Sequence, residues 1–573
     1  MIIHSIRKEL FYSHRFLSLL FIFLLLFLQS CRKHDFLENR WVYVSRTLQS
    51  DRHVSEIKEI VEQASNNGLN GMVFSGRLDN LYIQNSAYFD RLAKVKSICD
   101  SYNIEIIPII FSAGYGSAVI YDNKNLAVGL PVESLPYLVQ NGHARLIRDR
   151  TLSIINGDFE QAENNSLANT HLQDLPGQIS FVDRKIKKQG RQSIRFQNFD
   201  KHPNGNARLM YEVKLKPYRN YKITTWVKTE NLNPAENLRF QIYSGDGRTL
   251  KIYSAKINPT SNWTKIQFDF NSMNYDAVNL YAGVWRGISG KFWVDDLRIS
   301  EIGLANVLRR PGTPIVVKSA ANGETYQESK DFKTINDPKF NFYSSHDGPT
   351  IRILPNSRIQ NNDTLLVSYY QGLAINNSQV SLCLSEPKLY ELWRERVQQL
   401  HEVLSPKKYL LSMDEIRQGG TCAACKSRGI SMAEILGDCI SKQSEILKEL
   451  NPQNEIFIWS DMLDPNHNAK DNYYLVDGDF TGSWNYIPKD ISIVCWYYEM
   501  RDKSLAHFSN LGFKTIGAAY YDGADLDNPK GWLESLANTE NSIGIMYTTW
   551  QNKYQLLTPF SKLVLERRNR NRK

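Results

Sequence analysis

Strand-like and helix-like segments alternate along this chain; the alternation stops near residue 119 and resumes near residue 375. Before the interruption, strand-like runs at 41–45, 71–74 and 104–111 are separated by helical periodicity at 53–66 and 88–102. After it, strand-like runs occur at 409–413, 455–460, 491–496, 515–520 and 543–548, with helical patterns at 387–404 and 432–450. Strands that alternate with amphipathic helices predict parallel pairing, with the helices packed on the sheet.

Three strands before the interruption and five after it make eight. This count predicts an α/β fold, a (β/α)8 TIM barrel with a large all-β insertion after the third barrel strand. The interrupting segment has many short alternating runs and almost no helical periodicity, which is typical of a jelly-roll-like β-sandwich. We expect the first barrel part at 31–118, the sandwich at 150–302, a small β-rich extension at 303–372 and the second barrel part at 373–566.

The N-terminus carries an apolar run at 16–28, preceded by Arg7, Lys8 and Arg15. This run is short for a membrane span, and the pattern is that of a signal peptide at 1–30. The run ends in Leu-Gln-Ser-Cys31, which resembles a bacterial lipobox, so Cys31 is expected to carry a lipid. We expect an exported lipoprotein of the cell envelope, periplasmic or at the cell surface, that contacts the membrane through this anchor. A simple cleaved signal and a retained anchor are the alternatives.

Part of the net charge of +9 belongs to a basic tail at 567–573. Like charges at a terminus are typical of a solvated tail, so we expect no nucleic-acid partner. The oligomeric state is left open.

Six cysteines follow Cys31 at scattered positions that do not indicate a disulfide scaffold. Cys422 and Cys425 have the spacing of a zinc knuckle, but the sequence holds no second such pair. We therefore expect no metal site and no cofactor there. A local disulfide or two free thiols is the interpretation for this pair.

Two adjacent carboxylates, Asp414 and Glu415, end the apolar run 409–413. Neighbouring residues of a strand point to opposite faces, so both acids can reach one pocket only where the strand stops. Placed there, such a pair can act on a glycosidic bond as acid and base. The alternative is a helix N-terminus, where acids are also favoured.

Polar and aromatic residues mark the C-terminal ends of the other barrel strands, where the active sites of such barrels lie. These residues are Arg46, Trp459, Asp461, Trp496, Tyr521, Asp522 and Trp550. A single Trp is more often a core residue than part of a ligand site. Acids, an arginine and several aromatic residues at the same end of the barrel favour a sugar-binding pocket.

The barrel segments resemble a family 20 glycoside hydrolase, the β-N-acetylhexosaminidase group. The resemblance is carried by strand-end segments spread over about half the chain. These segments are Arg40-Trp-Val-Tyr-Val-Ser-Arg46, Gly68-Leu-Asn-Gly-Met-Val-Phe74, Leu384-Ser-Glu-Pro-Lys-Leu-Tyr390, Asp414-Glu415, Ile458-Trp-Ser-Asp461, Tyr521-Asp522 and Trp550.

The resemblance implies a substrate-assisted retaining hydrolysis of glycans that contain N-acetylhexosamine. Glu415 would be the general acid/base, and Asp414 would orient the 2-acetamido group, whose carbonyl attacks the anomeric carbon. Tyr521 would donate a hydrogen bond to that carbonyl, and Arg46 would hold hydroxyls of the terminal sugar. The sugar and its acetamido group would be enclosed by Trp459, Trp496 and Trp550.

The sequence departs from the family at several positions. Leu410, Ser412 and Met413 replace the His-x-Gly-Gly pattern before the acid pair, and Met413 adds bulk there. Asn552 stands where the family often has an acid, and Ser75-Gly76-Arg77 stands where family members carry a His. These departures indicate a reshaped pocket.

The insertion resembles a carbohydrate-binding module at both of its ends, Asn156-Gly-Asp-Phe-Glu160 and Phe292-Trp-Val-Asp-Asp-Leu297. In many such modules acids near the two ends hold a structural calcium, which nominates Glu160 and Asp296. The alternative is that these acids cap turns.

Two other functions remain open from the sequence. One is a glycosidase that uses Glu415 with a second enzyme carboxylate, Asp461 or Glu386, on another sugar. The other is a glycan-binding lipoprotein without turnover, which the changes at Leu410, Ser412 and Met413 favour. A scaffold for an envelope partner rests only on size and the insertion.

Overall fold

The computed structural model describes residues 35–163 and 165–572. Eight parallel strands close into a barrel in the order β1 (Asn39–Ser45), β2 (Gly71–Ser75), β3 (Glu105–Ile110), β22 (Lys408–Leu411), β24 (Glu455–Trp459), β26 (Ser492–Cys495), β27 (Thr515–Tyr520) and β28 (Ser542–Thr548). β28 pairs with β1, which closes the ring. The expected fold is confirmed as a closed eight-stranded parallel barrel together with a large all-β region, which is inserted between β3 and β22.

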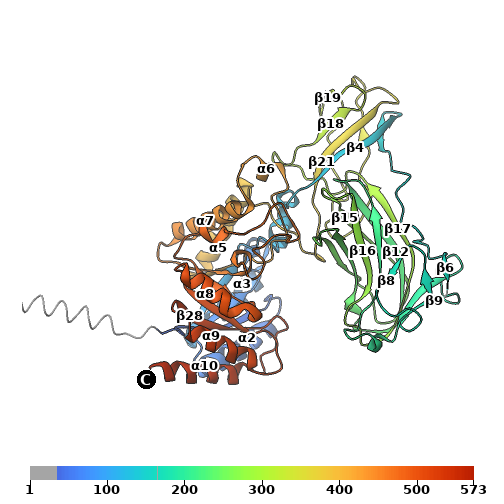
Figure 1. The fold of residues 1–573 in the computed structure, drawn as a ribbon. Coiled ribbons are helices and arrows are strands. Elements are labelled where there is room, and N and C mark those ends of the chain that lie inside the picture. The colour runs from blue at the N-terminus through green and yellow to red at the C-terminus, as the bar shows by residue number, and fades with distance from the viewer. Residues whose placement is uncertain (1–34, 164, 573) are drawn as a thin grey trace, which may run out of the picture.

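Helices surround the barrel in the lower left of Figure 1. They are α2 (Asp51–Asn66), α3 (Ser86–Ser101), α5 (Pro387–Leu404), α7 (Met432–Leu450), α8 (Arg501–Asn510), α9 (Asp527–Ala537) and α10 (Leu557–Arg572), with the short α4 (Ser117–Asp122) and α6 (Ala423–Lys426) in loops. Their ends follow local chemistry. Pro387 starts α5, where its missing N–H costs nothing. Ser431 and Glu434 form a reciprocal capping box at the start of α7.

The barrel interior is packed with side chains that alternate along each strand. Trp41 and Tyr43 of β1 point inward, as do Phe457 and Trp459 of β24, because residues two apart share a face. The Trp41 and Phe457 rings meet edge to face with centroids 4.8 Å apart. The alternate residues of the strands pack outward against the helices. The interior is therefore a packed core, and the cavity described below lies at its C-terminal end.

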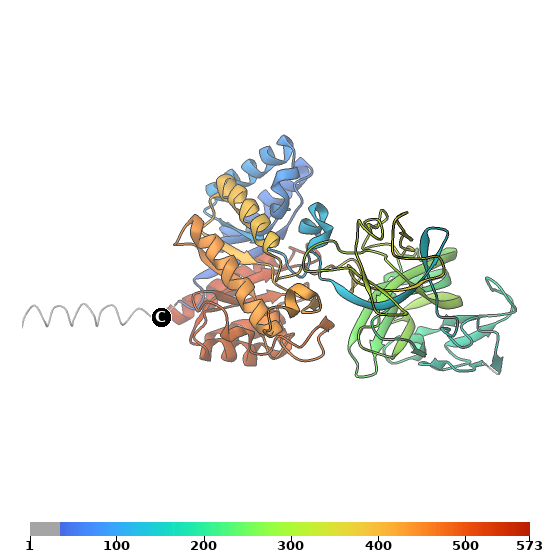
Figure 2. The ribbon, with the colours of Figure 1, turned by 90° about the horizontal axis from the view of Figure 1, so that it is seen from above.

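The sandwich lies beside the barrel (Figures 1 and 2). One sheet has the order β15 (Ser261–Asn271), β12 (Asn220–Asn233), β17 (Ser289–Ile302), β10 (Ser193–Gln197), β9 (Ser180–Asp183). The other has the order β14 (Thr249–Ser254), β13 (Leu238–Ser244), β16 (Ala277–Val284), β11 (Ala207–Lys214), β8 (His171–Leu172). A small hairpin, β6 (Ala162–Glu163) and β7 (Ser166–Leu167), extends from it.

A third sheet connects the two bodies and corrects the expected boundaries. Its order is β19 (Thr325–Tyr326), β18 (Val316–Ser319), β21 (Thr364–Gln371), β4 (Leu130–Gln140), β5 (His143–Leu146), β20 (Ile351–Arg352). The extension expected at 303–372 is thus only part of this sheet, because β4 leaves the barrel and pairs antiparallel with the returning β21. Pairing between segments so distant in sequence leaves no local signal.

Contacts tie the sandwich to a barrel loop. The Arg248 guanidinium donates to the carbonyls of Tyr474 and Val476, at 3.2 and 2.6 Å. This loop also carries β25 (Leu475–Val476), which pairs with β23 (Gln418–Gly419), just after the acid pair. The sandwich therefore contacts a segment that reaches the site described below.

The basic terminus is helical, and it packs on the chain at Arg568 while Arg570 stays exposed. α10 continues through Arg572, and Arg568 forms an ion pair with Asp35 at 2.6 Å. Residues 1–34 lie outside the described residues, so the expected signal peptide and the lipidation of Cys31 stay predictions. Among residues 35–163 and 165–572, no helix combines the length and apolar character needed to span a bilayer.

Candidate active site

A cavity of about 510 Å³ opens at the C-terminal ends of the barrel strands, and the acid pair lies in its wall. This volume lies within the range of small-molecule sites. The lining residues are Tyr43, Ser75, Ile109, Ser112, Tyr115, Ser412, Asp414, Glu415, Trp459, Trp496, Tyr521 and Trp550.

Both carboxylates reach this cavity because β22 ends at Leu411, three residues before Asp414. Glu415 adopts a left-handed backbone with φ 49°, which breaks the strand alternation. Ser412 donates a hydrogen bond to Asp414 Oδ1 at 2.9 Å. Met413 is buried against Gln443 and does not line the cavity, so the expected extra bulk lies behind the site.

The loop after β3 packs directly on the backbone of the acid pair. A Cβ added to Gly114 would lie 2.0 Å from the Asp414 carbonyl oxygen and 2.9 Å from the Glu415 carbonyl. Only glycine fits at this distance. The loop places the next residue, Tyr115, so that its hydroxyl donates to Glu415 Oε2.

Glu415 is held from several directions. Arg417 forms an ion pair with its Oε1 at 2.7 Å, and the Arg417 side chain is only 9% exposed. Gln379 donates to the Glu415 carbonyl at 2.8 Å and accepts from Arg417. The Glu415 N–H donates to Asp461 at 2.9 Å. The carboxylate therefore has a fixed position in the wall of the cavity.

Asp461 supports the site from behind, and it does not line the cavity. Its carboxylate accepts hydrogen bonds from the Glu415 N–H, from Asn468 at 2.9 Å, and from Trp496 Nε1 at 3.3 Å. Burial, followed by the charge of Asp414, raises the pKa of Asp461 to about 7. Burial and then the neighbouring Glu415 charge also raise the pKa of Asp414 to about 6, although the Ser412 hydrogen bond opposes this.

Glu386 is not part of the cavity. It forms a buried ion pair with Arg310 at 2.6 Å. Neither Asp461 nor Glu386 therefore presents a free carboxylate beside Glu415.

Aromatic rings form the remaining wall. Trp496 and Tyr521 lie nearly parallel, at 4° with centroids 5.9 Å apart, and Trp550 meets Tyr521 at 75°. Trp459 and Tyr43 also pack against Trp550, with centroids 6.0 and 5.0 Å away. Burial raises the pKa of the Tyr521 hydroxyl, which therefore stays protonated as a donor.

Asp522 positions Trp550 and does not line the cavity. Its carboxylate accepts hydrogen bonds from the Trp550 N–H at 2.8 Å and the Gln551 N–H at 3.2 Å, and from the Thr549 hydroxyl. Three consecutive left-handed residues, Tyr520, Tyr521 and Asp522, form this turn. Such backbone strain persists where surrounding contacts fix it, often at functional sites.

Arg46 is not brought to the cavity wall. Its guanidinium binds Glu56 at 2.6 Å and donates to Asn552, and it lies over the Tyr554 ring at 5.7 Å. Its expected contact with a sugar stays a prediction.

The structure adds residues that the sequence did not single out. Tyr43, Ser112 and Tyr115 line the cavity, and Arg417 pairs with Glu415. The strand alternation could have identified Tyr43, since it lies two residues before the end of β1 and faces inward. Tyr115 and Arg417 lie in loops, where side-chain direction has no periodic signal.

The calcium expectation in the sandwich stays a prediction. Glu160 accepts from Arg191 and Gln192, and Asp296 pairs with Arg298. The carboxylates thus already have partners that are not a metal.

Comparisons with known proteins bear on the insertion. A family model described as "Carbohydrate binding domain" matches residues 152–287, which supports a carbohydrate as the partner of the sandwich. A solved CBM4 module aligns at 14% identity over 26% of this chain and 99% of its own, with a TM-score of 0.20. A xylan-binding domain from Paenibacillus barcinonensis aligns at 15% identity over 27% of this chain and 95% of its own, with a TM-score of 0.17.

A rhamnosidase from Novosphingobium sp. PP1Y aligns at 8% identity over 95% of this chain and 60% of its own, with a TM-score of 0.36. A search of curated proteins found no match.

Proposed function

We propose that this protein is an exported glycoside hydrolase that cleaves glycans containing N-acetylhexosamine by substrate-assisted retaining hydrolysis. The observation that carries this proposal is the cavity at the strand ends, which combines the adjacent carboxylates of Asp414 and Glu415 with an aromatic wall. The barrel would be of the TIM kind, and the catalytic domain would belong with the family 20 glycoside hydrolases.

The two carboxylates have distinct roles in this proposal. Glu415 protonates the glycosidic oxygen as the bond to the anomeric carbon breaks. The carbonyl oxygen of the substrate's acetamido group attacks that carbon in place of an enzyme nucleophile. Asp414 accepts a hydrogen bond from the acetamido N–H and stabilises the positive charge that develops on the ring. Glu415 then takes a proton from the water that opens the cyclic intermediate.

The aromatic wall supports an acetamido sugar as the occupant. Sugar faces and the acetamido methyl group are apolar, and they pack favourably on flat rings. Trp459, Trp496 and Trp550 supply these surfaces, and Tyr521 supplies a protonated hydroxyl for the acetamido carbonyl. Tyr521 also stands beside Trp496 and Trp550, so donor and rings act as one wall.

A glycosidase with a second enzyme carboxylate is disfavoured by the position of the other acids. Asp461 has both oxygens engaged behind the wall, and Glu386 is paired with Arg310. Neither has an oxygen free to attack a sugar or to activate water in the cavity.

A glycan binder without turnover is the second candidate, and one observation favours it. Arg417 forms an ion pair with Glu415 Oε1 at 2.7 Å, which engages one of the two oxygens that a general acid would present to the substrate. Turnover would require that the substrate displaces this ion pair, or that Glu415 Oε2 donates the proton to the substrate.

The sandwich would bind the same or a neighbouring glycan, in line with the family match at 152–287. Export and a lipid at Cys31 would place both parts at the cell envelope, where such glycans are encountered. Palmitate labelling of the expressed protein, with Cys31→Ala as the negative control, tests the anchor.

Hydrolysis of paired chromogenic β-glycosides tests the catalytic proposal. We expect the N-acetylglucosaminide to be cleaved and the glucoside to be left intact. Asp414→Asn should lower the acetamido activity by about 10²-fold or more, because it removes a charge aimed at the transition state. The exposed Asp471→Asn is the matched control. Equal cleavage of both sugars would exclude the substrate-assisted route, and binding without cleavage would support the second candidate.

A further inference from the structure

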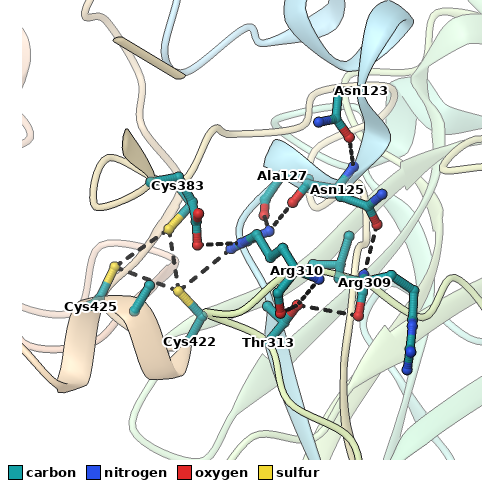
Figure 3. Close-up of polar contacts among 12 residues, drawn as sticks. Asn123, Asn125, Ala127, Arg309, Arg310, Thr313, Cys383, Cys422 and Cys425 are labelled. Atoms are coloured by element: carbon teal, nitrogen blue, oxygen red, sulfur yellow. Dashed lines mark hydrogen bonds and ion pairs between the residues drawn. The ribbon is translucent and has the colours of Figure 1, made fainter. Parts of the chain in front are cut away.

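Three buried cysteines form a triangle outside the active site (Figure 3). The Sγ atoms of Cys383 and Cys422 are 3.3 Å apart, and the Sγ atom of Cys425 lies 3.7 Å from each of them. Cys383 precedes α5, and Cys422 and Cys425 lie at the start of α6 and within it. Among the described residues, this is the one group of three or more potential metal ligands that converge.

The spacing of the sulfurs matches a metal site better than a disulfide. Zinc binds thiolate sulfur at about 2.3 Å, so two sulfurs of a tetrahedral site lie about 3.8 Å apart. The observed edges of 3.3 to 3.7 Å are close to that value. A disulfide needs about 2.05 Å and can join only two sulfurs, which would leave the third thiol buried and alone.

A buried arginine lies beside the sulfur triangle. The Arg310 guanidinium lies 3.7 Å from Cys422 Sγ, and its side chain is 6% exposed. It also pairs with Glu386 and donates to the carbonyls of Asn125 and Ala127. Arg310 is therefore placed to donate a hydrogen bond to the Cys422 thiolate of a metal site, although its charge is already balanced by Glu386.

Hydrogen bonds between Thr313 and the Arg310 backbone hold the arginine in place. Thr313 donates its N–H to the Arg310 carbonyl at 3.0 Å, and the Thr313 hydroxyl accepts from the Arg310 N–H at 3.3 Å. Figure 3 shows these contacts beside the sulfur triangle. Gly312 packs so closely that a Cβ there would lie 2.5 Å from the Ala424 side chain. The segment at Gly312, which follows the sandwich, therefore packs closely against α6.

We propose that Cys383, Cys422 and Cys425 bind a zinc ion, with an oxygen ligand in the fourth position. Water supplies this oxygen, or the Ser385 hydroxyl, whose oxygen is buried two residues after Cys383. This site joins the segment before α5, the loop that follows Asp414 and Glu415, and the returning insertion. It fixes these segments together and takes no part in the chemistry of the cavity.

The sequence pattern did not reveal this site because its third ligand is distant. Cys383 lies 39 residues before Cys422, across α5 and β22, and only the fold brings it to the Cys422–Cys425 pair. The expectation of no metal site rested on the absence of a second closely spaced pair.

Metal analysis of the full-length protein, purified in a reductant without chelator, tests the proposal. We expect close to one zinc ion per chain, lost in Cys383→Ala, Cys422→Ala and Cys425→Ala. Cys439→Ala removes a buried thiol outside the triangle and should keep the zinc. Cadmium added to the metal-free wild type should produce sulfur-to-metal charge-transfer absorption that the three variants lack.

Wild-type protein supplies a test that does not depend on the variants folding. Removal of zinc with a chelator should lower the melting temperature by several degrees, and zinc but not magnesium should restore it. The proposal is overturned if the reduced protein takes up no zinc on reconstitution. It is also overturned if protein purified without reductant carries no metal and has an intact mass lower by two hydrogens that a reductant restores, since this identifies a disulfide.

Discussion

Replacement of Asp461 by Asn should change how the stability of the barrel depends on pH. Asp461 is buried behind the acid pair, and its pKa rises from an ordinary 3.8 to about 7 in the fold. A carboxyl group whose pKa is raised by folding binds its proton more tightly in the native state. Its contribution to stability is therefore complete below pH 3.8 and is lost as the pH rises through about 7.

The size of the effect follows from these two pKa values. Between about pH 5 and pH 8, the wild type should lose about 2 to 3 kcal/mol of unfolding free energy at this residue. Asn cannot ionise, so the variant loses none of this. Asn also has one acceptor where Asp461 accepts from three donors, and this mismatch costs about 1 to 3 kcal/mol. That cost is the same at both pH values and cancels in the comparison.

Thermal unfolding followed by tryptophan fluorescence measures the change. The difference in melting temperature between variant and wild type should move in favour of the variant by on the order of 5 °C from pH 5 to pH 8. Asp471→Asn, at an exposed acid of the barrel, should show no such movement. A difference between Asp461→Asn and wild type that is equal at both pH values would refute the reasoning.

Three further predictions concern the acid pair itself. Gly114→Ala should lower activity at least tenfold, because its Cβ would collide with the Asp414 carbonyl, whereas Gly245→Ala, which has open space, should leave activity unchanged; equal kinetics for the two variants would contradict this. The kcat should fall as the pH drops through about 6, because Asp414 must be charged and its carboxylate is protonated below its pKa. A kcat that does not change between neutral pH and pH 5 would contradict the role of Asp414. Tyr115→Phe should lower kcat about tenfold with little change in KM, because the hydrogen bond to Glu415 is removed; steady-state kinetics that match wild type would exclude the contact from catalysis.

Much of the barrel was predictable from local pattern. The helices at 387–404 and 432–450 and the strand at 515–520 have the expected bounds, because apolar periodicity and terminal residues such as Pro387 and Ser431 define them. Trp459 faces the cavity because it lies two residues after the inward-facing Phe457. The acid pair lines the cavity because its strand has already ended.

The remaining features depend on contacts between segments distant in sequence. Arg46 directly follows the last residue of β1, but Glu56 and Asn552 engage its guanidinium. Tyr115 comes to Glu415 from a loop that only Gly114 allows to approach. Sequence pattern defines which way a strand residue faces, but it does not show which charged partner a loop will bring to it.

The role of Glu415 as general acid is the central claim, and the leaving-group dependence of Glu415→Gln tests it most directly. An N-acetylglucosaminide with a poor leaving group needs a proton from the acid, whereas a dinitrophenyl leaving group does not. We predict that the variant loses about 10³-fold in kcat/KM on the first substrate and little on the second. An equal loss on both substrates, or no loss on either, would contradict the account.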